Sequence, residues 1–474
     1  MRIVLTRLVV VTHWRSYPFA CLLLACLSFG LACDVMAGAP VSDDAENEPP
    51  GLHGAGESDW FSIHGQSTYI WQQKDNFRSP YSGQNSLTNK SEGGGAKSYT
   101  WSVTGFFGTR LWEGAEAYYN PEMFEGTPFT GALVGLGGFQ NGELQKGAFA
   151  PPTYYNARAF LKQTIGLGGG RLHLGTGPNQ IDGDVDKNRI VLSYGKVASL
   201  DYFDQNTYSH DPRTQFQNFS LWSMGAYGYA ADAKGYTYGV VGEWYQDDFI
   251  LRVARLATTT QPGGTQMDYT LRQNYIDTLE LTHSHTLWGQ PGALRALIYR
   301  QYANMATYNN ALNKAVNPDV TPTPLTAARS FTNSWGYGFN AEQAINDDVG
   351  VFARWSWNPG QTETLTLDMS RSLSGGVSIK GTDWGREADT VGLGYAINGI
   401  SGSEINYLSQ GYYTVYIGDG QIQSRTEQVA EAYYSAEICK GLSITGDFQH
   451  IANPAYNSGR GPVNFFGFRI HGEI

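Results

Sequence analysis

SLDYFDQNTYSHDPRTQFQNFSLWSMGAYGYAADAKGYTYG, residues 199–239, is polar and aromatic at once and contains no long apolar run. The Asp-Pro pair at 211–212 has the pattern of a helix start, with an acidic N-cap and proline at the first helical position. Phe216, Phe219 and Trp222 follow at helical spacing, whereas the flanking sequence alternates as strands do. We therefore predict a short helix in a loop that folds into the mouth of a β-barrel and narrows it.

The start of the chain has the pattern of a secretory signal. Three arginines precede an apolar run at residues 19–33, and small residues at 35–37 form a small-x-small cleavage site. We expect cleavage after Ala37, so that residues 1–37 are a signal peptide; an uncleaved anchor is the alternative. Residues 38–58 are acidic and rich in Pro and Gly, and we expect a disordered periplasmic leader. Residues 59–474 show no second linker and are expected to form one domain.

The composition excludes several classes of protein. Charged residues make up 16 % of the chain, below the roughly 25 % of ordinary soluble domains, and the net charge is −11. After signal cleavage only Cys439 would remain, which excludes a small secreted domain stapled by disulfides. After Ala37 no stretch approaches the ~20 apolar residues of a membrane-spanning helix. An exported, Gly- and Tyr-rich, acidic chain is typical of an outer-membrane barrel, although a soluble β-sandwich or propeller shares part of this composition.

Several segments alternate with a period of two, as strands that face lipid on one side and a polar lumen on the other require. In residues 101–110, Val103 and Phe107 share one face, whereas Thr104 and Arg110 share the other. The same alternation runs through residues 115–120, 237–244, 249–253, 349–358, 442–449 and 466–474. At roughly 25 residues per strand and its share of loop, the domain predicts an all-β, transmembrane antiparallel barrel of about sixteen strands. The amphipathic last segment ends on Ile474 and is similar to the assembly signal of such barrels.

An ordered series of short motifs resembles the OprB-related carbohydrate-selective porins over nearly the whole mature chain. The series comprises FRSPYSG (77–83), GTRLW (108–112), EAYYNPE (116–122), GFQNGE (138–143), NAR (156–158), DPRTQF (211–216), NPAYN (453–457) and RGP (460–462). The resemblance implies a barrel of about sixteen strands in the bacterial outer membrane. It also implies passive diffusion of small neutral sugars, typically glucose, with no catalytic residues and no cofactor.

Passage of a neutral sugar requires aromatic faces for its ring and paired donors and acceptors for its hydroxyls, with weak binding so that it leaves again. Residues of these types at lumen-side or loop positions are the candidate pore-lining residues: Arg110, Glu116, Asn120, Glu122, Arg158, Asp204, Arg213 and Asn218. For each, a structural ion pair or loop tether is the alternative. For Asp211, the N-cap role outweighs sugar contact. Arg213 lies in a predicted first helical turn, which disfavours a cation, so we expect an acidic partner or a functional use.

The sequence leaves several alternatives to a sugar porin. A barrel enzyme such as a lipase would need a catalytic group at the rim, and no Gly-x-Ser-x-Gly motif occurs. A channel for anions or aromatic acids should show an excess of Arg and Lys, and a plugged structural barrel is a further alternative. Residues 182–188 imitate half a calcium loop but lack its sixth-position glycine, and the pair His283 and His285 lacks a third ligand, so we expect no metal. Nucleic-acid binding is not supported; outer-membrane lipid is an expected partner, and a homo-oligomer is left open.

Overall fold

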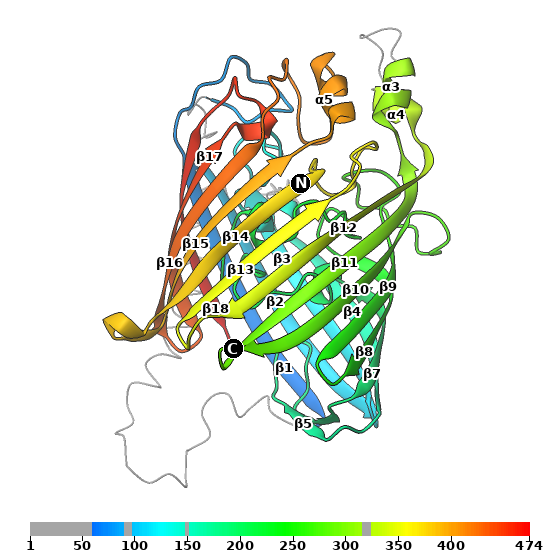
Figure 1. The fold of residues 1–474 in the computed structure, drawn as a ribbon, viewed down its shortest axis with the longest axis vertical. Coiled ribbons are helices and arrows are strands. Elements are labelled where there is room, and N and C mark those ends of the chain that lie inside the picture. The colour runs from blue at the N-terminus through cyan, green and yellow to red at the C-terminus, as the bar shows by residue number, and fades with distance from the viewer. Residues whose placement is uncertain (1–58, 90–96, 147–150, 315–323) are drawn as a thin grey trace, which may run out of the picture. The chain divides into compact units, whose positions relative to one another are not determined.

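The computed structural model describes residues 59–89, 97–146, 151–314 and 324–474, which lie in one compact unit, Gly56–Ile474. The predicted signal peptide (1–37) and leader (38–58) lie outside the described residues. Sixteen antiparallel strands close into a barrel, as predicted, because β1 pairs with β18 (Figure 1). Closure satisfies the backbone groups that an edge strand would leave unpaired. In the described part of the chain, no helix is long and apolar enough to cross a membrane.

The barrel strands follow the chain, with one short hairpin inserted between β4 and β7. Their bounds are β1 Phe61–Lys74, β2 Lys97–Trp112, β3 Ala115–Thr127, β4 Thr153–Gly166, β7 Arg189–Val197, β8 Thr237–Gln246, β9 Phe249–Ala257, β10 Tyr275–Leu287, β11 Gln290–Met305, β12 Ser330–Ala344, β13 Val349–Trp357, β14 Arg371–Gly381, β15 Arg386–Gly399, β16 Glu427–Cys439, β17 Leu442–Ala452 and β18 Val463–Glu473. The hairpin pairs β5 (Arg171–Leu174) with β6 (Gly183–Asp186), so part of the calcium-like segment is a strand.

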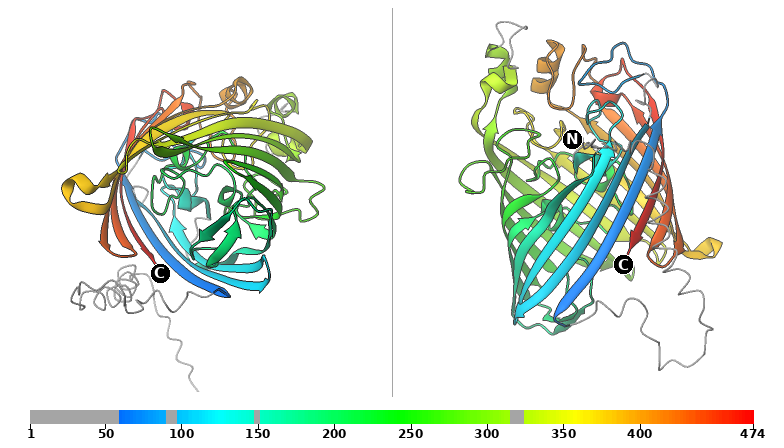
Figure 2. Two further views of the ribbon diagram at one scale, coloured as in Figure 1. Left: turned by 60° about the horizontal axis from the view of Figure 1, so that its bottom comes forward. Right: turned by 180° about the vertical axis from the view of Figure 1, so that it is seen from behind.

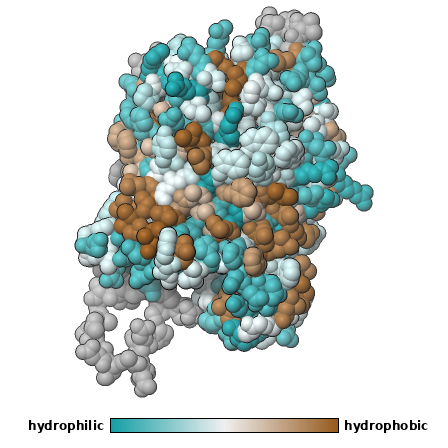
Figure 3. All heavy atoms as spheres, in the orientation of Figure 1, coloured by the Kyte–Doolittle hydropathy of each residue, from teal (hydrophilic) through white to brown (hydrophobic). Residues whose placement is uncertain are grey.

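The alternation predicted from the sequence is present on the strands. On β2, Val103 and Phe107 are 37 % and 44 % exposed, whereas Ser102 and Thr104 are each 1 % exposed. On β13, Trp355 faces outward and the neighbouring Arg354 is buried inside. On the face drawn in Figure 3, outward apolar side chains gather in a belt across the barrel. The outer surface is therefore suited to lipid, and the polar side chains of the strands face inward.

At one end of the barrel the strands are joined by short turns and by the β5–β6 hairpin, and at the other end longer segments carry α3 (Tyr308–Lys314), α4 (Pro324–Ala328) and α5 (Gly402–Ser409) (Figure 1). At this long-loop end, these helices pack around buried Tyr308 and Tyr407. Apart from α2 (Phe219–Trp222) in the β7–β8 loop, the other short helices of the described residues are 3-10 turns: η3 Gly142–Lys146, η4 Ser199–Asp201, η5 Thr382–Trp384 and η6 Pro454–Tyr456. The β7–β8 loop, residues 198–236, is the longest connection between neighbouring barrel strands. It folds into the interior of the barrel (Figure 2).

The β7–β8 loop differs from its predicted form in the position of its helix. Residues 212–214 form a turn in which the carboxylate of Asp211 accepts from the Arg213 N–H (2.9 Å) and the Thr214 hydroxyl (3.1 Å). The helix, α2, spans only Phe219–Trp222, and its N-cap is Asn218, whose side chain accepts from the Ser220 N–H. The predicted start at 211–212 is therefore wrong by about two turns.

Two buried carboxyl groups near α5 predict a pH-dependent stability at the long-loop end. Burial raises the pKa of Asp368, in the β13–β14 loop, to about 7. Burial and the neighbouring Asp368 also raise the pKa of Glu404 on α5. Glu363, close by, is ion-paired with Arg329 at 2.8 Å. A raised folded-state pKa means that the stabilisation is complete in acid and is lost as the pH rises through the folded-state value.

We therefore expect backbone amides of residues 358–370 and 400–426 to lose hydrogen-exchange protection between pH 5 and pH 8. Asp368→Asn should reduce the pH dependence of this protection, because one of the two titrating carboxyl groups is gone and the other, Glu404, loses its acidic neighbour. Asp383→Asn, an exposed carboxylate in η5, is the matched control and should change nothing. Protection that is equal at both pH values in the parent protein would contradict this prediction.

Candidate functional site

Buried polar side chains of the barrel wall hold one half of the β7–β8 loop. Arg354 on β13 pairs with Asp204 at 2.8 Å, and the side-chain amide of Asn340 on β12 donates to the same carboxylate at 2.6 Å. Glu280 on β10 accepts from the backbone N–H of Asp204 at 2.8 Å. The Asp204 side chain also accepts from the Met224 N–H at 2.6 Å, so it ties two parts of the loop together. Asp204 is completely buried and serves as a tether.

Strands β16 and β18 hold a second part of the loop through its backbone. Glu431 on β16 accepts from the N–H groups of Gln217 and Asn218 at 2.5 and 2.9 Å. Arg469 on β18 donates to the carbonyl groups of Pro212 and Thr214 at 3.0 and 2.7 Å. Because a buried charge is costly without partners, these contacts fix the loop in one position.

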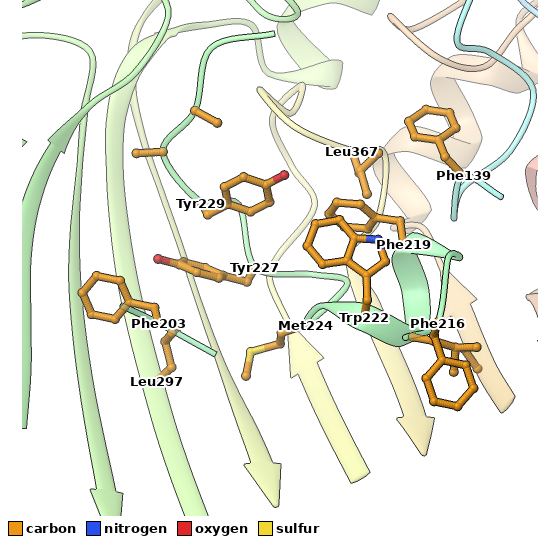
Figure 4. Packing of buried hydrophobic residues seen from close by; sticks show 14 of the residues in the cluster. Phe139, Phe203, Phe216, Phe219, Trp222, Met224, Tyr227, Tyr229, Leu297 and Leu367 are labelled. Atoms are coloured by element: carbon orange, nitrogen blue, oxygen red, sulfur yellow. The ribbon is translucent and has the colours of Figure 1, made fainter. Parts of the chain in front are cut away.

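Apolar packing supports the same loop from its aromatic side. Phe216 contacts Phe352 on β13 and Tyr433 on β16, with ring centroids 5.5 and 5.0 Å away. Phe219 packs edge-on against Trp222, and Figure 4 shows both rings on α2 beside other buried loop residues. Phe216 is therefore packed against the barrel wall, and the two aromatic residues of α2 are part of the same buried cluster.

Arg213 lies at the centre of a compact network of charges. Its guanidinium contacts Glu122 on β3 at 2.9 Å and Glu143 on η3 at 3.1 Å. Lys146 binds the same two carboxylates, at 2.8 Å for Glu122 and 3.6 Å for Glu143, and the hydroxyl of Tyr236 donates to Glu122 at 3.0 Å. Burial opposes the charged form, but Glu143 and Glu122 outweigh it and raise the pKa of Arg213 above its ordinary value. The acidic partners expected for Arg213 are thus present.

A cavity of about 740 Å³ runs along the loop and the wall formed by β2–β4 and β7–β9. Its lining includes Trp222 and Tyr236 from the β7–β8 loop and Asp184 from the β5–β6 hairpin. Eight Lys or Arg residues and seven Asp or Glu residues line it, so the charges nearly balance although the whole chain is acidic. Aromatic rings interrupt these charges: Phe106, Phe160, Tyr202, Trp222, Tyr229, Tyr236 and Tyr245.

Most charged groups along this cavity are paired with each other. Arg158 forms a two-point contact with Asp201, at 2.5 and 2.6 Å. Lys162 pairs with Glu116 at 2.5 Å, and Arg110 lies 3.9 Å from the same carboxylate. Pairing cancels the charges of the two partners, but each paired side chain keeps donors or acceptors that are not used within the pair. The wall can therefore offer donors and acceptors to a polar solute without a strong preference for either sign of charge.

The structure separates the eight predicted site residues into two groups. Four of them line the cavity: Arg110, Glu116, Arg158 and Arg213. The other four are at most 2 % exposed and lie behind the cavity wall: Asn120, Glu122, Asp204 and Asn218. Glu122 anchors Arg213, Asp204 anchors Arg354 and Asn218 caps α2, so these three act through other groups. The loop covers Glu122, whereas Asp204 and Asn218 lie within the loop and contact other protein groups, so the structure does not place these three residues at the cavity.

Sequence reasoning missed several groups that the cavity uses. Arg252, in the alternating segment 249–253, is not among the predicted site residues, yet it lines the cavity and pairs with Glu243 at 2.8 Å. Lys146 and Tyr236 lie outside the strands and follow no period, so no local pattern could mark them. Among the described residues, no group of three or more His, Cys, Asp or Glu side chains is placed to hold a metal ion.

Comparisons with known proteins agree with this architecture. A high-pH structure of Pseudomonas putida OprB is similar with a TM-score of 0.63 at 13 % identity, covering 88 % of this chain and 94 % of that one. The outer-membrane channel DcaP of Acinetobacter baumannii gives a TM-score of 0.51 at 11 % identity, covering 87 % and 97 %. At these identities the likeness concerns the fold alone. No curated protein matches the sequence.

The family model for the carbohydrate-selective porin, OprB family, matches residues 108–473, which is most of the chain. The matched segment contains the β7–β8 loop, the Arg213 network and fifteen of the sixteen barrel strands in whole or part. Together with the closed barrel and its apolar belt, the match identifies an outer-membrane channel protein. The chain belongs to the OprB family of carbohydrate-selective porins.

Proposed function

We propose that this protein is a passive channel that prefers small neutral sugars such as glucose, and that it has no enzymatic activity. The observation that carries the proposal is the lining of the 740 Å³ cavity, which combines paired charges of both signs with seven aromatic side chains. A neutral sugar can use the hydrogen-bonding groups and stack on the rings, whereas an ion gains little from a wall without net charge. The β7–β8 loop acts as the constriction in this proposal.

The proposal also includes the route by which the protein reaches its membrane. Residues 1–37 direct the chain through the secretory pathway and are then removed, and residues 38–58 remain in the periplasm as a leader. The basic region, the apolar core and the small-x-small site of the first 37 residues support this route.

Liposome swelling with the purified barrel tests the proposed function. We expect glucose to enter faster than amino acids of equal size, and sucrose to enter more slowly than glucose because it is larger. Equal rates for all solutes would indicate a general channel, and an absence of swelling would indicate a plugged barrel. Faster entry of anions than of glucose would support the rival channel for other solutes.

A pair of variants in the constriction loop tests the role of the aromatic lining. Trp222→Leu should weaken the block of ion current by glucose about two- to tenfold, since one aromatic contact contributes about 0.5–1.5 kcal/mol. Phe216→Leu is the matched control, because Phe216 lies in the same loop but packs against the wall and does not line the cavity. Equal weakening in both variants would indicate a change in loop packing instead of a lost sugar contact.

A further inference from the structure

Three charged side chains form a row on the outer, lipid-facing surface of the barrel. Arg255 on β9 lies directly opposite Asp277 on β10, and Asp277 lies directly opposite Arg300 on β11. Side chains on each strand alternate between the two faces, and these three share the outward face with Val253 and Ile298, which are 46 % and 56 % exposed. Outward charges on a barrel are costly at the membrane midplane and tolerated near its surfaces. Charged side chains on this surface therefore need polar groups to contact.

Neighbouring side chains of the protein satisfy only some of the hydrogen-bonding groups of these three residues. Arg255 makes a two-point contact with Asp277, at 2.7 and 2.8 Å, and its guanidinium lies over the ring of Tyr275 at 4.1 Å. Arg300 donates twice to the side-chain oxygen of Asn333, at 3.0 and 2.9 Å. Within the described part of the chain, Arg300 forms no ion pair. The row thus has one positive charge in excess, and the guanidinium of Arg300 has only a neutral acceptor.

The row borders an apolar hollow on the same surface. The hollow has a volume of about 820 Å³ and is lined by the three charged residues together with apolar side chains of β7–β12. Its apolar lining includes Leu192, Val240, Val253, Leu279, Ile298 and Trp335. Gly242 contributes no side chain to this surface and so leaves space between its neighbours. One continuous depression therefore combines an apolar wall with a cationic rim.

The position of the row along the strands places it at one surface of the membrane. Arg255 lies two residues before the end of β9 and Asp277 two residues after the start of β10, at the long-loop end. In barrels of this class the long loops are extracellular, so this end lies in the outer leaflet. Tyr275 and Tyr302 form an aromatic contact beside the row, with centroids 5.9 Å apart, as in an interfacial girdle. The charged row thus lies at the level of lipid headgroups.

We propose that this depression binds one phosphate-bearing lipid of the outer leaflet. The phosphate accepts hydrogen bonds from Arg300 and from the free side of Arg255, and an acyl chain occupies the apolar hollow. Charge complementarity selects an anionic headgroup, because the row has an excess positive charge, and the planar guanidinium groups match phosphate oxygens in geometry. The inference rests on the outer-membrane location and not on the proposed sugar preference.

Lipid binding by the purified, delipidated full-length barrel tests the site. Native mass spectrometry with the bisphosphorylated glucosamine lipid that anchors lipopolysaccharide should show one retained lipid per chain. The double variant Arg255→Gln/Arg300→Gln should bind this lipid about tenfold more weakly or worse. Arg371→Gln is the matched control, because Arg371 is also an exposed arginine at the long-loop end of its strand but does not line the hollow, and its binding should be unchanged.

Three results would overturn the proposal. Equal lipid binding by the double variant and the parent would remove the two arginines from the site. Equal binding of the same lipid without its phosphates would remove the phosphate from the recognition. An oligomer of the parent that dissociates in the double variant would make the depression a contact between copies of this chain. Liposome swelling by the double variant should match the parent, which shows that the barrel is folded and keeps this test separate from the proposed function.

Discussion

Replacing Arg354 with methionine is expected to enlarge the ion current through the channel and to destabilise the barrel. The substitution keeps apolar volume but removes the charge that faces Asp204 at 2.8 Å. Asp204 would then keep its hydrogen bonds to Asn340 and Met224 but would be a buried carboxylate without a cation. Breaking a buried pair by removing one partner costs about 3–5 kcal/mol, which is a large part of the stability of a typical domain. The loop should therefore leave the wall in a substantial fraction of molecules.

Two measurements check this expectation. Single-channel conductance in planar bilayers should rise and fluctuate, and the urea midpoint of the barrel in liposomes should fall. The double variant Asp204→Asn/Arg354→Met is the control, because it removes both charges and leaves an amide that keeps hydrogen-bonding capacity. This double variant should recover part of the lost stability. Together with the two single variants it forms a double-mutant cycle, which measures the interaction energy of the pair. Parent-like conductance and stability in Arg354→Met alone would show that this ion pair does not hold the loop.

Arg213→Ala is expected to make the channel more selective for cations and to change its block by glucose. In the parent, Arg213 and Lys146 balance Glu122 and Glu143. Removal of one cation leaves one negative charge in excess at the wall of the cavity, where low dielectric strengthens its effect. The ratio of cation to anion permeability should rise about two- to tenfold, measured as the reversal potential across a KCl gradient.

Two further variants separate charge from shape at this position. Arg213→Lys keeps the positive charge and should keep the reversal potential of the parent, although it loses the two-point geometry. Arg213→Ala/Glu143→Gln restores the charge balance and should return the selectivity toward the parent value. If Arg213→Ala matches the parent in both reversal potential and glucose block, then Arg213 does not belong to the functional site.

The strand pattern could be predicted from the sequence because it depends on a local period. Side chains on a strand alternate between two faces, and the two faces of this barrel meet lipid and a polar interior. This requirement predicts Phe107 outward and Arg110 inward, and both lie where they were predicted. The strand count followed from chain length and the usual length of a strand and loop.

The helix in the β7–β8 loop was misplaced because the barrel wall competes for its backbone groups. A helix from 211 onward would pair the Thr214 carbonyl with the Asn218 N–H. Instead, Arg469 donates to that carbonyl and Glu431 accepts from that N–H. The helical turn can form only beyond these contacts, where Asn218 caps α2. The local sequence pattern predicted a helix in this loop but did not predict the residue at which the helix begins.

The sequence by itself determined the two faces of the segments that alternate and the resemblance to the family, and these two features together predicted the barrel. Only the tertiary structure decided which polar residues reach the cavity. Glu116 and Glu122 have the same side-chain chemistry and lie on the same face of β3, yet Glu116 lines the cavity and Glu122 is covered. The difference arises because Arg213, 91 residues away along the chain, folds against Glu122 with its loop. Whether a polar side chain is covered depends on where a distant segment of the chain packs. The local alternation of the sequence contains no information about that packing.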